Sequence, residues 1–132
     1  MSALVGSALR GVFGSMAMTG CRVLATEVGW LEQPPPQQVF RERVPEEQSR
    51  AVEEVVHWLY GALGGAAFGL LPDSVRHAPG AGPAYGVAAW LGFEVGIAPL
   101  LDLSHHKRHG LRAHVALLAD HAVYGTILSA DR

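Results

Sequence analysis

The sequence has few charged residues and a single cysteine. Of its 132 residues, 17 % are Asp, Glu, Lys or Arg, where a soluble domain usually carries about 25 %. Cys21 stands alone, which excludes an intramolecular disulfide and a cysteine-based metal site. The net charge of −2 argues against a nucleic-acid partner, because nucleic-acid binding usually requires a basic face.

The motifs of enzymes are also missing. The chain contains no nucleophile–base motif, no phosphate-binding glycine loop and no strong metal-ligand spacing. We therefore expect a protein that is not an enzyme and that needs no cofactor.

Hydrophobic residues make up 49 % of the chain and gather in four long segments. Each is close to the ~20 residues that a helix needs to cross the hydrocarbon of a bilayer, and none alternates with period two. A soluble bundle would need helices with wet faces, whereas the second segment has no polar face from 55 to 71. The sequence predicts an all-α fold of one domain, a polytopic membrane protein with four transmembrane helices in a glycine-packed bundle. The helices are expected over about 5–31, 45–72, 83–102 and 111–130, with a proline-rich connector loop at 32–44.

Small residues recur at four-residue spacing in these segments. Such stripes let helix backbones approach closely in lipid. The predicted packing positions are Gly61, Gly65, Gly69, Gly92 and Gly96. We also expect a kink beside Glu94, because Pro99 cannot donate a hydrogen bond to the carbonyl of Val95.

Ionisable residues interrupt the apolar segments near their middles. The stretch "LRAHVALLADHAVYGTIL", residues 111–128, is the most informative example. A charge at the bilayer centre is costly and normally faces protein or water with a partner. The sequence therefore predicts a buried polar cluster of Arg22, Glu94, Asp120, His121 and Tyr124. It is interpreted either as an internal ion pair that fixes helix docking or as a proton or ion relay.

A second group of polar residues is expected near one membrane face. Its members are Glu27, His57, Tyr60 and His114, and they are possible ligand-binding residues. Paired histidines from parallel helices are one way to hold haem or a transition metal. No two histidines share a span at ligand spacing, so this remains an alternative to an interfacial hydrogen-bonding role.

Two short motifs repeat along the chain. "HWLYG" begins at His57 and "HAVYG" begins at His121, which indicates two similar helical hairpins in a parallel internal repeat. With these motifs, "GVFGSMAMTG", "LEQPPPQQVFRER" and "YGVAAW", the chain resembles the YagU-like family of small bacterial inner-membrane proteins of unknown function. The resemblance implies a multi-pass, four-helix protein of the bacterial inner (cytoplasmic) membrane, and it transfers no catalytic residue.

Three functions are consistent with these patterns. The first is a small integral membrane protein that acts as a packing or accessory subunit, in contact with the lipid bilayer and present as a homo-oligomer or in a membrane protein complex. The second is a small oligomeric proton-coupled transporter or permease with Glu94 and Asp120 as titrating sites. The third is a haem- or metal-binding membrane protein that uses His57 and His114.

Overall fold

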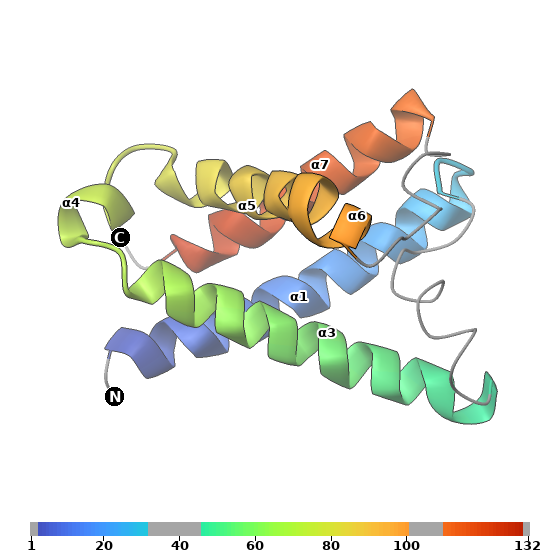
Figure 1. Ribbon diagram of the computed structural model, residues 1–132, viewed down its shortest axis with the longest axis horizontal. Helices are drawn as coiled ribbons and strands as arrows, with labels where there is room; N and C mark the ends of the chain where they lie inside the picture. The colour runs from blue at the N-terminus through green and yellow to red at the C-terminus, as the bar shows by residue number, and fades with distance from the viewer. Residues whose placement is uncertain (1–2, 32–45, 101–109, 131–132) are drawn as a thin grey trace.

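The computed structural model describes residues 3–31, 46–100 and 110–130, and all of their regular secondary structure is helical (Figure 1). The predicted all-α class is confirmed. Four long helical segments are present, and the predicted connector at 32–44 lies outside the described residues. The segments are α1 (Ala3–Glu27), α3 (Glu46–Gly69), α5 (Ala81–Gly92) with its continuation η1 (Phe93–Ile97) and α6 (Ala98–Leu100), and α7 (Leu111–Leu128).

Helix α1 ends earlier than the hydrophobic pattern predicts. Gly29 has φ of 75°, in the left-handed region where glycine has no steric penalty. The amide groups of Trp30 and Leu31 both donate to the carbonyl of Ala25, at 2.8 and 3.2 Å. This left-handed turn after the last helical residues is the usual way for a glycine to close a helix.

A short helix that the sequence analysis missed follows α3. Helix α4 (Asp73–Arg76) begins after Pro72, whose carbonyl accepts from the amide groups of Val75 and Arg76 at 2.9 and 3.0 Å. Proline is favoured at such a helix start because it lacks the amide hydrogen that would otherwise be unsatisfied.

The expected irregularity beside Glu94 takes the form of a π-helix. Residues Phe93–Ile97 form η1, and α6 continues the same segment through Pro99. Proline removes one hydrogen bond from the helix that precedes it, and π-helical turns are a known response to a disrupted ladder. The kink predicted from Pro99 therefore corresponds to a widened turn.

The helices form two antiparallel hairpins that cross and pack together (Figure 1). Helix α1 packs against α3, and α5 packs against α7; the two hairpins meet mainly where α1 contacts α7. Helix α1 begins and α7 ends on the same side of the molecule, beside α4 (Figure 1).

Small residues bring the helices of each hairpin into backbone contact. A Cβ atom added to Gly65 would lie 2.9 Å from the Cα of Gly11, and one added to Gly61 would lie 2.6 Å from the carbonyl oxygen of Gly11. In the second hairpin, a Cβ on Gly125 would lie 2.6 Å from the carbonyl carbon of Gly82. The final glycines of "HWLYG" and "HAVYG" thus occupy corresponding crossing points.

The predicted packing positions divide into two groups. Gly69 also lies at the α1–α3 contact, where an added Cβ would be 2.8 Å from the Cβ of Ser7. Gly92 and Gly96 differ, because within the described residues no atom beyond their chain neighbours and their own helix backbone lies within 4 Å of a Cβ built there. The described structure therefore shows no helix packed against these two glycines, and this end of the α5 segment continues into η1.

No helix among the described residues combines the length and the apolar character that a membrane span requires.

Candidate functional site

Two apolar clusters fill the bundle, and a polar layer lies between them. One cluster contains Met18, Phe68, Tyr124 and Leu128, and the other contains Leu31, Ala113 and Leu117. Along α1, Arg22 follows Met18 by one turn; along α7, Asp120 lies between Leu117 and Tyr124. The arrangement buries a cation and a carboxylate from two different hairpins.

Both charged groups are almost completely removed from solvent. Arg22 is 7 % exposed and Asp120 is 3 % exposed. Arg22 lies within electrostatic reach of both Asp120 and Glu54. Arg22 therefore attracts Asp120 electrostatically, and among the described residues no hydrogen bond or ion pair joins the two side chains directly.

Helix α3 contributes to this layer through a threonine bridge. The Arg22 Nη2 donates to Thr19 Oγ1 at 3.2 Å, and Thr19 Oγ1 donates to Glu54 Oε2 at 3.0 Å. Sequence reasoning missed Thr19 and Glu54. The position of Thr19 could have been predicted, because Thr19 lies three residues before Arg22 and therefore shares the same face of the helix.

His57 and His121 belong to the same layer. The Nε2 of His57 is buried and has no hydrogen-bond partner among the described residues. His57 lies within electrostatic reach of Arg22 and His121. The Nδ1 of His121 lies 2.9 Å from the carbonyl oxygen of Leu117, so its own helix fixes the ring. One histidine of each repeated motif thus enters the cluster.

Glu94 does not join these residues, contrary to prediction. It lies in η1 and is only partly buried, and among the described residues no hydrogen bond or ion pair joins it to Arg22 or Asp120. Among the described residues, η1 packs mainly against its chain neighbours α5 and α6, so Glu94 is not part of the α1–α7 contact that carries Arg22 and Asp120. The position of a residue along its apolar segment did not predict which helices are in contact.

In the described part of the chain, no hydrogen bond or ring contact joins His57 to His114, which the sequence predicts as a pair. The ring of His114 packs edge-on against Trp90, with centroids 6.2 Å apart, and its Nδ1 lies 3.2 Å from the carbonyl oxygen of Gly110. His57 lies near the middle of α3, whereas His114 is in the first turn of α7.

The other members of that predicted ligand group are dispersed. Glu27 is exposed at the end of α1, and Tyr60 is 49 % exposed on α3. In the part of the chain that the structure describes, no three His, Cys, Asp or Glu side chains gather as a metal site would require. Haem or metal binding through His57 and His114 gains no support from this geometry.

Two tyrosines join the hairpins by hydrogen bonds to α3. Tyr124, 5 % exposed, donates its hydroxyl to the carbonyl oxygen of Gly61 at 2.7 Å, and Tyr85 donates to that of Gly64 at 2.7 Å. Tyr85 also packs edge-on against Phe68, with ring centroids 5.1 Å apart. Tyr124 thus belongs to the hairpin interface next to the polar layer, and the role of Tyr85 was not predicted.

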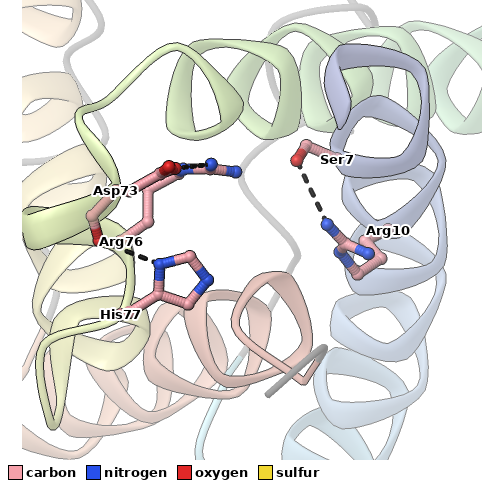
Figure 2. A network of polar contacts seen from close by, with 5 residues as sticks. All are labelled: Ser7, Arg10, Asp73, Arg76 and His77. Carbon is pink, nitrogen blue, oxygen red and sulfur yellow. Dashed lines mark hydrogen bonds and ion pairs between the residues drawn. The ribbon is translucent and has the colours of Figure 1, made fainter. Parts of the chain in front are cut away.

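A separate set of polar contacts lies at the end of the bundle where α4 is found (Figure 2). Arg76 donates to Asp73, and the Nδ1 of His77 lies 2.9 Å from the carbonyl oxygen of Asp73. Nearby on α1, Arg10 donates to Ser7 Oγ at 3.2 Å. The hydrogen bond and the positive charge of Arg76 lower the pKa of the exposed Asp73 carboxyl. Charged groups thus mark this end of the molecule.

Comparison of the chain with models of protein families, with curated proteins and with solved structures finds no match in any of the three.

Proposed function

We propose that this chain is a small integral membrane protein that acts as a packing or accessory subunit of a membrane assembly. The observation that carries the proposal is the distribution of apolar side chains. Large hydrophobic residues are exposed on every long helix, and examples are Phe13, Leu63, Val95 and Val115, at 62, 70, 76 and 45 % exposure. A soluble monomer rarely exposes such continuous apolar surface, whereas lipid would cover it favourably.

The interior supports the same proposal. Its buried residues include five polar or charged side chains, Ser7, Ser15, Arg22, Glu53 and Asp120. A bundle with polar groups inside and apolar groups outside is the arrangement expected when hydrocarbon is the solvent.

The mean hydropathy of a helix is an average over the face that points into the bundle and the face that points outwards, so buried polar residues lower it. Arg22 and Asp120 lower the average for α1 and α7 although both side chains point into the bundle. The long helices have adequate length: at 1.5 Å per residue, α1 with 25 residues extends ~37 Å and α7 with 18 residues extends ~27 Å, compared with ~30 Å of hydrocarbon.

Two further features, the charged end of the bundle and the glycines Gly92 and Gly96, are consistent with a role in a membrane assembly. Arg10, Arg76 and His77 gather where α1 begins, which suits the headgroup region of a bilayer. Among the described residues, no other helix packs within 4 Å of a Cβ at Gly92 or Gly96, and a surface of small residues can receive another membrane helix closely. These features favour an accessory role in an assembly over a solitary bundle.

Spin labels at single cysteines test the membrane location. In a Cys21→Ser background, Leu63→Cys and Val115→Cys place the label on two exposed apolar faces, and Asp73→Cys places it at the charged end. In phospholipid vesicles, the first two labels should collide more with apolar oxygen than with a water-soluble nickel chelate. The label at position 73 should show the opposite preference. Greater nickel access at positions 63 and 115 would contradict the proposal.

A further inference from the structure

The carboxylate of Asp120 is a buried acceptor without a donor. Its side chain is 3 % exposed, and neither Oδ1 nor Oδ2 has a hydrogen-bond partner among the described residues. An ionised carboxylate in this condition would lose its hydration and gain no hydrogen bond in return, which is strongly unfavourable. The neutral acid form avoids most of that cost.

The nearby positive charge is already shared. Arg22 attracts both Asp120 and Glu54, and the Thr19 hydroxyl connects its guanidinium to Glu54 by hydrogen bonds of 3.2 and 3.0 Å. In the described part of the chain, no hydrogen bond or ion pair joins Arg22 directly to Asp120. One guanidinium therefore serves two carboxylates, and a proton on Asp120 would make the three groups together neutral.

The other ionisable groups around Asp120 do not supply a second compensating charge. Cys21 on α1 lies within electrostatic reach of Asp120, α3 carries the buried Glu53 and the half-buried His57, and α7 carries the adjacent His121. Helix α5, which packs against α7, has no charged residue between positions 81 and 92.

We propose that Asp120 is a proton-binding site, with Arg22 as the positioning residue that keeps a fixed charge beside it. A proton fits this position better than a metal ion, because the Arg22 guanidinium repels other cations and no set of three metal ligands is found among the described residues. The buried Nε2 of His57, which has no hydrogen-bond partner among the described residues, can also accept a proton in its neutral form.

Proton release would act on the junction between the hairpins. Arg22 belongs to the α1–α3 hairpin and Asp120 to the α5–α7 hairpin, and α1 and α7 are in contact. A new negative charge there would have to be hydrated or moved towards Arg22, and either change alters how α1 and α7 pack. This inference depends on burial inside the bundle and holds whether or not lipid covers the outside.

Infrared spectroscopy of the full chain in detergent micelles tests the site directly. The protein is prepared with and without ¹³C in the aspartate carboxyl groups, and the carbonyl band of a protonated carboxylic acid is followed by pH titration. At pH 7 the wild type should show this band, and the isotope should shift it. Asp120→Asn should abolish the band, whereas Asp73→Asn, which removes an exposed carboxylate, should retain it.

Each result of this infrared experiment either supports or overturns the proton site. An isotope-sensitive band that is lost only in Asp120→Asn establishes the proton site. A wild-type spectrum without a protonated aspartate at pH 7 overturns it, and that measurement needs no variant to fold. Retention of the band in Asp120→Asn would also overturn the assignment. For the role of Arg22, Arg22→Gln should shift the pH at which the band disappears upwards by at least one unit; an unchanged midpoint would remove Arg22 from the site.

Discussion

At the scale of single residues, the hairpins are joined by directed polar contacts as well as by apolar packing. The hydroxyl of Tyr124 donates across 2.7 Å to the carbonyl oxygen of Gly61, and the ring fills the space left by Gly14. A Cβ on Gly14 would lie 2.6 Å from the Tyr124 Cδ2, so the glycine and the aromatic ring are complementary. A tyrosine is thereby positioned between α1, α3 and α7.

Tyr124→Phe should destabilise the protein by about 0.5–1.5 kcal/mol, because the hydroxyl donor is lost while the ring remains. The free energy of unfolding is measured by titration with a denaturing detergent. Tyr60→Phe is the matched control in the other "H-x-x-Y-G" motif: Tyr60 is 49 % exposed, and we expect a change below about 0.5 kcal/mol. Equal losses in the two variants would show that the Tyr124 hydrogen bond has no special role.

At the scale of elements, the close approach of α1 and α3 depends on residues without a side chain. Gly65 faces the backbone of Gly11, which cannot move aside as a flexible side chain would. Gly20 lies in the same α1 helix with nothing within 4 Å of an added Cβ. Gly65 and Gly20 have the same intrinsic helix propensity, but a side chain would be crowded at Gly65 and free of neighbours at Gly20.

Gly65→Ala should destabilise the protein by about 1–3 kcal/mol, since overpacking separates α1 from α3. Gly20→Ala should instead stabilise by up to about 1 kcal/mol, because alanine favours the helix and meets no neighbour. Unfolding titrations on both variants check the difference in sign. A stabilising Gly65→Ala would mean that the hairpin does not cross as closely as the structure indicates.

At the scale of the whole molecule, the described helices expose large apolar side chains, and no other described helix covers Gly92 and Gly96. Gly92 and Gly96 lie on the α5 segment with exposed Leu91 and Val95 beside them. In a bilayer this surface suits another helix, from a second copy or from another subunit.

If copies of this chain associate through that surface, Gly96→Leu should weaken their association by at least about tenfold, or 1.4 kcal/mol. The bulky side chain holds the approaching helix away. Native mass spectrometry of the detergent-solubilised protein reports the distribution of oligomers. Gly20→Leu, a substitution at an equally open glycine on α1, should leave the distribution unchanged. Equal effects of the two variants would place the contact elsewhere.

The sequence by itself determined the elements of this protein. Hydrophobic length, proline positions and glycine spacing predicted the all-α class, the four long segments and the irregular turn near Glu94. It also predicted that Arg22, Asp120 and His121 belong together, because polar groups in apolar helices must face the interior. The residues of one segment are sufficient for such predictions, since each prediction depends only on that helix and on whether its side chains are buried or exposed.

Only the tertiary structure decided which helices touch and at what level. Glu94 is left out because η1 packs on α5 and α6 and not at the α1–α7 contact, and His57 lies within electrostatic reach of His121. Thr19, Glu54 and Tyr85 enter through contacts between residues 21 or more positions apart. Crossing angle and register between helices arise from the fit of whole surfaces, and no single segment of the sequence specifies them.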